Sequence, residues 1–175
     1  MKFDDRFNKL YTSLINEAKQ FLLTEESYPT EEELKNYFQE MNISEDNEYL
    51  YLKEGQYLEE VEGNGGWGAT HGPLAQIVKV IMPGFYLVSK VAIKNIGSKD
   101  EQKWVLNDEK SNYSWYEKEY PVIVSNYKDS NYLAWYMGKN NGNLNTYLNG
   151  YVLVNDVNEY LDTYIVDYKF DPEKY

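Results

Sequence analysis

The side chains best suited to chemistry lie in one short run, residues 63–72, which reads GNGGWGATHG. The run holds five of the chain's eleven glycines, the aromatic side chain of Trp67 and the only histidine, His71. Histidine is the side chain whose unperturbed pKa allows proton exchange near neutrality. Because Glu60 and Glu62 are close to it in sequence, His71 is the candidate general acid or base of a hydrolytic or transfer reaction.

The same run contains a literal G-x-G-x-x-G from Gly63 to Gly68, a pattern typical of dinucleotide sites when a buried strand precedes it. Here the preceding residues 59–62 read EEVE, the bulky Trp67 lies inside the turn, and no acidic residue occurs near Ser89 to bind a ribose. A single histidine without cysteine, and without paired spacings such as H-x-x-x-H, offers no recognisable metal site. The sequence therefore predicts no cofactor and no metal.

The net charge of −12 is concentrated at the start of the chain. Residues 1–62 hold 16 acidic and 6 basic side chains (net −10), whereas residues 63–175 hold 13 acidic and 11 basic ones (net −2). A negative field repels phosphate backbones and anionic membranes, so we expect no direct binding to nucleic acid or membrane. The expected partner is a basic protein surface or a self-assembly partner. The candidate binding residues are Glu31, Glu32, Glu40, Asp46, Glu48, Glu59, Glu60, Glu62, Trp67 and His71.

The composition favours a folded, soluble, intracellular protein. Hydrophobic residues make up 42% of the chain and aromatic residues 17%, which argues against disorder. The absence of cysteine excludes disulfides and thiolate nucleophiles and fits a reducing compartment. The sequence shows neither a signal-peptide pattern nor a run of about 18 apolar residues that would span a membrane. The expected location is the cytoplasm.

Helical patterns dominate the expected elements before the glycine-rich run. Apolar side chains recur every three or four residues over 3–22, which predicts an amphipathic helix that either packs on its own domain or docks a partner. A second helix begins at Thr30, because Thr30 and Glu33 have capping-box spacing and glutamates occupy its first turn. The run at residues 49–52 is short and rich in aromatic side chains, which favours a strand over a third helix.

Strand patterns dominate the expected elements after the run. Apolar side chains at helical spacing after Pro73 first predict a helix over residues 74–81. Aromatic and β-branched runs then predict strands over 85–96, 103–106, 113–127, 132–137 and 144–154, the last two joined by a hairpin turn at 138–143. Asp156 and Glu159 have capping spacing and begin a helix whose apolar face continues to Tyr168 and should pack on the sheet.

Together these elements predict an α+β fold in a single domain, residues 1–175. Its expected parts are an acidic helical N-terminal third (1–62), a Gly-rich junction (63–72), and a mainly antiparallel sheet of about five strands with a C-terminal amphipathic helix (73–175). The junction is either a hinge between an acidic lobe and a nearly neutral sheet or a loop shaped to bind a small ligand.

The opening of the chain also carries a resemblance. Residues 3–18, FDDRFNKLYTSLINEA, contain a phenylalanine, a Leu-Tyr pair and a Leu-Ile-x-Glu end. In these features the segment resembles the opening of small proteins from tailed phages. The resemblance implies a virion component, or an early protein that blocks a host function, located in the virion or in the host cytoplasm.

Two hypotheses from different classes follow. The leading one is a non-enzymatic acidic protein-interaction module. It has two versions: a virion accessory protein, or an inhibitor that mimics nucleic acid and binds a basic host protein. The alternative is a small enzyme in which His71 acts as general acid or base in the Gly-rich loop.

Overall fold

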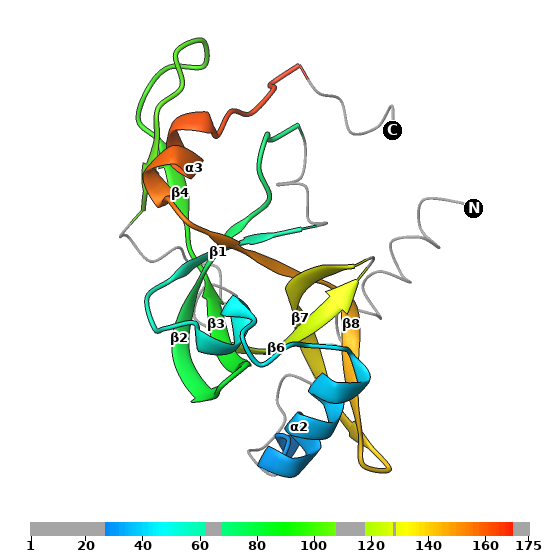
Figure 1. The fold of residues 1–175 in the computed structure, drawn as a ribbon. Coiled ribbons are helices and arrows are strands. Elements are labelled where there is room, and N and C mark those ends of the chain that lie inside the picture. Colours follow the sequence, from blue (N-terminus) through cyan, green and yellow to red (C-terminus); the bar gives the residue numbers. More distant parts are fainter. Residues whose placement is uncertain (1–26, 62–67, 108–117, 128, 170–175) are drawn as a thin grey trace, which may run out of the picture.

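The fold comes from a computed structural model that describes residues 27–61, 68–107, 118–127 and 129–169 (Figure 1). Within these ranges the helical elements are the α-helices α2 (Glu31–Glu40) and α3 (Val157–Thr163) and the 3-10 helix η2 (Glu48–Tyr51). The strands are β1 (Tyr57–Glu60), β2 (Leu74–Met82), β3 (Phe85–Lys90), β4 (Ile93–Asn95), β5 (Trp104–Leu106), β6 (Tyr120–Tyr127), β7 (Ser130–Asn140) and β8 (Asn143–Val154).

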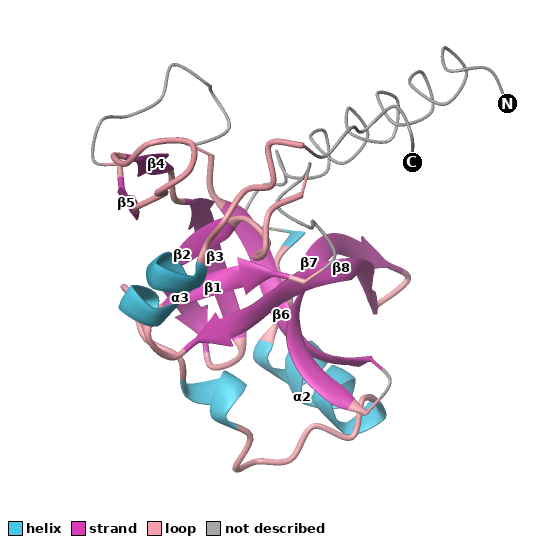
Figure 2. Ribbon diagram, turned by 90° about the horizontal axis from the view of Figure 1, so that it is seen from above, coloured by secondary structure: helices cyan, strands magenta, loops and turns pink. Residues whose placement is uncertain are grey.

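Six strands close into an antiparallel barrel in the order β1-β2-β3-β6-β7-β8, and β8 pairs with β1 to complete it (Figures 1 and 2). β4 and β5 form a separate two-stranded sheet inserted between β3 and β6. A closed antiparallel meander needs an even number of strands, and closure leaves no unpaired edge. The mixed α+β prediction is confirmed, but a barrel of six strands and a small second sheet replace the expected sheet of about five.

Alternate side chains of the barrel strands fill its interior. Successive side chains of a strand point to opposite faces, so Tyr86 and Val122 point inward while their neighbours Phe85 and Ile123 lie on the outside. The buried interior set is Leu58, Ala75, Ile77, Tyr86, Val88, Val122, Val124, Leu133 and Tyr151. The barrel is therefore a packed core, as expected for so few strands.

Two helices cover different parts of the barrel's outer surface (Figures 1 and 2). Leu34 and Tyr37 of α2 pack on Phe85, Ile123 and Tyr136, which lie on β3, β6 and β7. The apolar side chains of α3 pack in a third cluster with those of β1, β2 and the β4–β5 sheet. The prediction that the C-terminal helix packs on the sheet is confirmed.

Residues 74–82 form strand β2, so the helix predicted over 74–81 is wrong. The start of β2 is buried on both faces, because Leu74 packs against α3 while Ala75 and Ile77 point into the barrel. Register shifts after Ile77 and after Val80 also break the strict alternation of a strand. The result is an apolar pattern that periodicity alone does not separate from a helix.

Residues 48–51 form the 3-10 helix η2, so the strand predicted over 49–52 is wrong. The side chain of Asn47 caps it, since its oxygen accepts the Tyr49 backbone N–H at 2.9 Å. The strand in this region is β1, and the N-terminal third is therefore not wholly helical. The helix predicted over 3–22 lies outside the described residues.

Predictions that depend on a few neighbouring residues are confirmed. Both bonds of the Thr30–Glu33 capping box are present, at 3.2 Å and 3.0 Å. The side chain of Asp156 caps α3. The β7–β8 hairpin turns at Asn141 and Gly142, whose φ values of 52° and 81° are the two positive values of a type I′ turn.

Several predicted boundaries change. The strands expected at 103–106, 132–137 and 144–154 are present as β5, β7 and β8, whereas the strand expected at 85–96 is divided between β3 and β4, in different sheets. The later part of the strand expected at 113–127 is β6, and its first residues, 113–117, lie outside the described residues. The last helix ends at Thr163, short of the predicted Tyr168, because the chain becomes extended at Tyr164.

Candidate functional site

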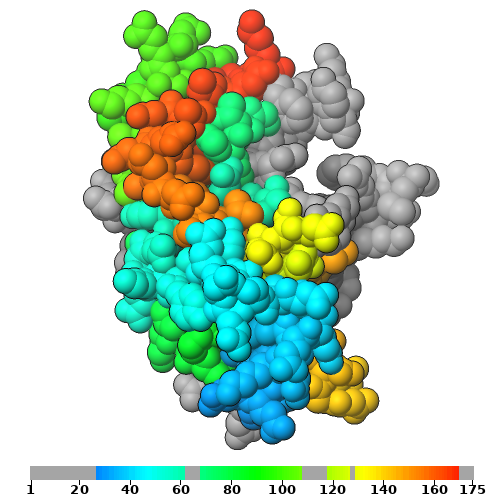
Figure 3. All heavy atoms as spheres, in the orientation of Figure 1, coloured from blue at the N-terminus to red at the C-terminus, as the bar shows by residue number. Residues whose placement is uncertain are grey.

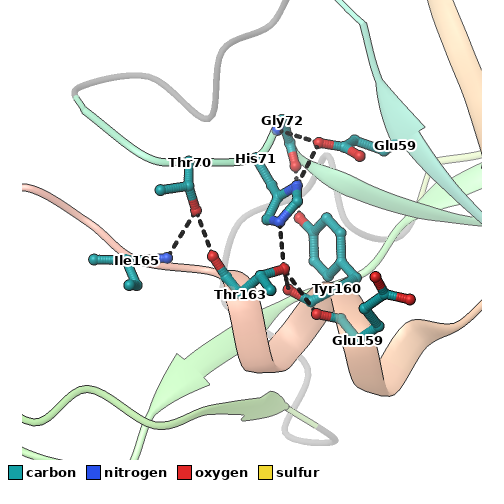
Figure 4. Close-up of polar contacts among 8 residues, drawn as sticks. All are labelled: Glu59, Thr70, His71, Gly72, Glu159, Tyr160, Thr163 and Ile165. Carbon is teal, nitrogen blue, oxygen red and sulfur yellow. Dashed lines mark hydrogen bonds and ion pairs between the residues drawn. The ribbon is translucent and has the colours of Figure 1, made fainter.

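The end of the glycine-rich run is fastened to the segment that follows α3 (Figure 4). The Thr70 backbone N–H donates to the Ile165 oxygen at 2.9 Å, and Ala69 forms a β-bridge with Val166. The Thr70 hydroxyl accepts the Ile165 N–H at 2.9 Å and donates to the Thr163 backbone oxygen at 2.8 Å. Residues 68–72 are therefore held against the segment after α3, whereas residues 63–67 of the predicted junction lie outside the described residues.

These contacts place His71 between a carboxylate and a hydroxyl (Figure 4). Its Nδ1 lies 3.1 Å from Oε1 of Glu59, and its Nε2 lies 2.7 Å from Oγ1 of Thr163. The ring centroid is 4.8 Å from that of Tyr160 and 6.3 Å from that of Tyr164, on which it stacks. We call Glu59, His71, Thr163, Tyr160 and Tyr164 the His71 cluster.

The donors and acceptors of the His71 cluster allow two proton arrangements. An ionised carboxylate only accepts, so Glu59 Oε1 accepts from both His71 Nδ1 and the Gly72 N–H. When the Thr163 hydroxyl donates to the Glu159 backbone oxygen, 2.7 Å away, Nε2 donates to Oγ1 and the ring carries both protons. When the ring carries one proton, the hydroxyl turns and donates to Nε2. The hydrogen bond between His71 Nε2 and Thr163 Oγ1 can therefore be donated from either atom.

The ring of Tyr160 packs against the ring of His71. Its hydroxyl donates to the Gly72 backbone oxygen at 2.5 Å. Burial raises the pKa of Tyr160, and the adjacent Tyr164 and Glu59 raise it further. The phenol therefore stays protonated and keeps its role as a donor.

A carboxylate, an imidazole and a hydroxyl in this order are the three groups of a serine-type triad. In such a triad the carboxylate orients the imidazole, which removes the hydroxyl proton. The sequence identifies His71 as the centre of any such chemistry but does not identify Thr163. The two residues are 92 positions apart, and no local pattern links them.

A single segment, from α2 to the turn before β1, carries exposed carboxylates that we call the acidic face. Figure 3 shows this segment, blue to cyan, across the front of the molecule. Lys35 forms an ion pair with Glu31 at 3.1 Å, but both side chains are at least 70% exposed, so the pair contributes little. The acidic face consists of Glu31, Glu32, Glu40, Glu45, Asp46, Glu48 and Glu54.

Buried contacts fix the acidic face on the barrel. The Tyr37 hydroxyl of α2 donates to Oγ of Ser125 in β6 at 2.9 Å. Glu33 lies 3.0 Å from Lys139, and its pKa is lowered by the Thr30 backbone N–H and then by Lys139. Glu33 therefore stabilises the helix, while the other carboxylates of α2 face solvent.

Two of the predicted binding glutamates, Glu59 and Glu60, lie on β1 and not on the acidic face. They point to opposite sides of the strand, because side chains alternate along it. Glu59 points outward to His71, whereas Glu60 is only 8% exposed and accepts from Nδ2 of Asn149 at 2.8 Å. Glu62 and Trp67 lie outside the described residues. The structure thus separates the predicted residues into the acidic face, the His71 cluster and one buried carboxylate.

No protein-family model matches the chain, and neither a curated protein nor a solved structure matches it. In the part of the chain that the structure describes, no helix is long and apolar enough to cross a membrane. The same part contains no group of three or more His, Cys, Asp or Glu side chains placed to hold a metal ion. A function must therefore be argued from the side chains themselves.

Proposed function

We propose that the chain is a non-enzymatic interaction protein that binds a basic protein surface through the acidic face. The observation that carries this proposal is the presence of seven exposed carboxylates within residues 31–54, on a segment anchored to the barrel by buried contacts. Residues 27–61 contain ten acidic side chains and two lysines, so the local field is strongly negative.

This field selects the class of partner. Phosphate backbones and acidic surfaces are repelled, whereas a basic surface is drawn toward complementary charges. Two roles suit such a partner, and both agree with what the resemblance of residues 3–18 implies: an inhibitor that mimics nucleic acid, or a virion accessory protein. They differ in salt dependence, because a charge mimic loses affinity steeply with ionic strength and an apolar assembly interface does not.

Charge neutralisation tests the proposal. The full chain and its variants are used to capture proteins from a bacterial lysate at low and high salt, followed by mass spectrometry. The face variant combines Glu31→Gln, Glu32→Gln, Glu40→Gln and Glu48→Gln. We expect this variant to retain about tenfold less of the captured basic proteins, because each exposed charge contributes a few tenths of a kcal/mol.

A matched control neutralises the same number of exposed carboxylates elsewhere on the molecule. It combines Asp100→Asn, Glu101→Gln, Glu119→Gln and Asp162→Asn. The control is expected to capture the same proteins as the native chain. Equal losses in the two variants would show that net charge, rather than the acidic face, determines binding and would contradict the proposal.

The geometry of the His71 cluster favours a second candidate, a small hydrolytic or transfer enzyme. The 2.7 Å between His71 Nε2 and Thr163 Oγ1 is within proton-transfer distance, and Glu59 orients the ring. In this role Thr163 would attack an acyl or phosphoryl group and pass its proton to His71, which would give that proton to the leaving group as the bond to it breaks. Where the hydroxyl instead donates to the Glu159 backbone oxygen, it would first have to turn toward His71 Nε2.

A fluorophosphonate probe, which reacts with activated hydroxyls and releases fluoride, separates the two functions. The interaction role predicts no labelling of the native chain, and His71→Ala should leave the captured proteins unchanged. Labelling at Thr163 that His71→Ala slows by about 100-fold or more would instead establish the enzyme. Thr163→Val serves as the control, since it removes the hydroxyl that would be labelled.

A further inference from the structure

A polar hollow of about 270 Å³ opens within the acidic face, near the end of the barrel that η2 covers. Figure 3 shows this region, where the cyan segment after α2 borders the yellow start of β7. The side chains that matter for its chemistry are four amides and two carboxylates: Asn42, Asn47, Asn126, Asn131, Asp46 and Glu48.

The four amides come from different elements that the fold brings together. Asn42 follows α2 in the left-handed conformation, with φ of 55°. Asn47 is held as the cap of η2 by its bond to the Tyr49 N–H. Asn126 and Asn131 are direct partners in the β6–β7 ladder. The hollow is therefore built on anchored backbone.

The lining selects a ligand that donates hydrogen bonds and carries positive charge. The carboxylates of Asp46 and Glu48 only accept. The amides of Asn42, Asn126 and Asn131 each have an accepting oxygen as well as donors, whereas the Asn47 oxygen already accepts the Tyr49 N–H. The Ser44 hydroxyl gives its proton to Asp46, so its oxygen is left to accept. None of the described lining residues is cationic, so nothing among them neutralises the two carboxylates.

We propose that this hollow receives the guanidinium group of an arginine side chain of the basic partner, an inference that rests on the proposed function. Pockets for drug-sized ligands have volumes of roughly 300–1,000 Å³, so 270 Å³ suits a single side chain. Guanidinium presents five donors in a rigid plane, whereas the lysine ammonium is a compact point charge. Arginine therefore matches a wall of amide and carboxylate oxygens better than lysine does.

A bare metal ion is the less suitable occupant. Hard cations are held by several carboxylates at fixed distances, and the described residues contain no group of three acidic or histidine side chains that could hold one. An arginine head group needs only well-placed acceptors and is among the side chains that most often dominate protein interfaces. The hollow is thus the part of the acidic face that gives specificity, and the surrounding carboxylates attract the partner.

The test titrates the full chain, labelled with ¹⁵N, with the peptide acetyl-Lys-Gly-Arg-Gly-Lys-amide. Two further peptides carry lysine or uncharged citrulline in place of the arginine. We expect the arginine peptide to shift the side-chain amide resonances of Asn42, Asn126 and Asn131. It should bind about tenfold more tightly than the lysine peptide, because only guanidinium can form bidentate bonds.

Two variants locate the preference. Asp46→Asn keeps the shape and removes one charge, and Asn131→Ala removes one amide. Both should reduce the arginine-to-lysine affinity ratio to near one. Asp100→Asn, at an exposed site outside the hollow, makes the same charge change as Asp46→Asn and should leave the ratio unchanged.

The outcomes separate this inference from the proposed function. The arginine and lysine peptides could bind equally well, with binding that is weakened both by salt and by the substitutions of the face variant. This result would overturn the arginine site and leave the acidic face as the binding surface. An unchanged ratio in both Asp46→Asn and Asn131→Ala would overturn the site in the same way. Failure of every basic peptide to bind at low salt would overturn both.

Discussion

Replacing Tyr86 by phenylalanine is expected to lower the free energy of unfolding by about 3 kcal/mol. The Tyr86 side chain is fully buried in the barrel, and its hydroxyl serves three backbone groups. It donates to the Tyr49 oxygen at 2.7 Å and accepts the N–H groups of Leu52 at 3.1 Å and Gly84 at 3.2 Å. Phenylalanine fills nearly the same space but leaves all three groups without this partner, in a place where water is excluded.

The measurement is urea unfolding of the native chain and the variant, with amide hydrogen exchange as a second readout. In the variant, amide exchange at Leu52 and Gly84 should be faster than in the native chain. The increase should exceed what the loss of global stability alone would cause. Tyr160→Phe is the control, because the equally buried Tyr160 hydroxyl makes a single bond, to Gly72, and should cost about 1 kcal/mol. Similar losses in both variants would show that Tyr86 does not anchor η2 through its shared hydroxyl.

Replacing Gly72 by alanine is expected to destabilise the protein by more than about 3 kcal/mol. A Cβ at this position would lie 2.0 Å from the backbone oxygen of Glu60 and 3.1 Å from its carbon. The clash is with backbone of β1, which pairs with β2 and β8 and has no room to move. Any shift of Gly72 would also strain its bonds to Glu59 and Tyr160, and so displace the His71 cluster.

Gly142→Ala separates this steric effect from backbone strain. Gly142 lies in the β7–β8 turn with φ of 81°, and a Cβ there would meet nothing within 4 Å. The alanine should cost only about 1 kcal/mol, from the positive φ. Chemical denaturation of both variants provides the comparison. A Gly72→Ala variant as stable as Gly142→Ala would mean that the connection between β1 and His71 is looser than the contacts indicate.

The sequence was most informative where a signal depends on adjacent residues. The Thr30 capping box, the Asp156 cap and the Asn141–Gly142 turn each satisfy backbone groups within a few positions, so residue types alone identify them. The sequence was least informative for β2, where burial on two faces and register shifts hide the alternation of a strand. Barrel closure causes that burial and is not a local property.

The candidate sites also combine residues that the sequence identifies with partners that only the fold brings close to them. His71 was recognisable because it is the only histidine, and the acidic face because the charge is concentrated in the first third of the chain. The partners were not recognisable: Thr163 lies 92 residues from His71, and Asn126 and Asn131 are remote in sequence from Asp46. A carboxylate's role also depended on the face of the strand to which it points, since the adjacent residues Glu59 and Glu60 of β1 point outside and inside the barrel, respectively.

By itself, then, the sequence determined the charge distribution, the helix caps, the hairpin turn and the mixed composition of helix and strand, because short-range chemistry sets each of them. Only the tertiary structure decided that the strands close into a barrel and that α2, η2 and α3 attach to it. It also decided which polar side chains meet. The physical reason is that these contacts require distant segments to come together, and the shared burial of apolar side chains from many strands drives that step.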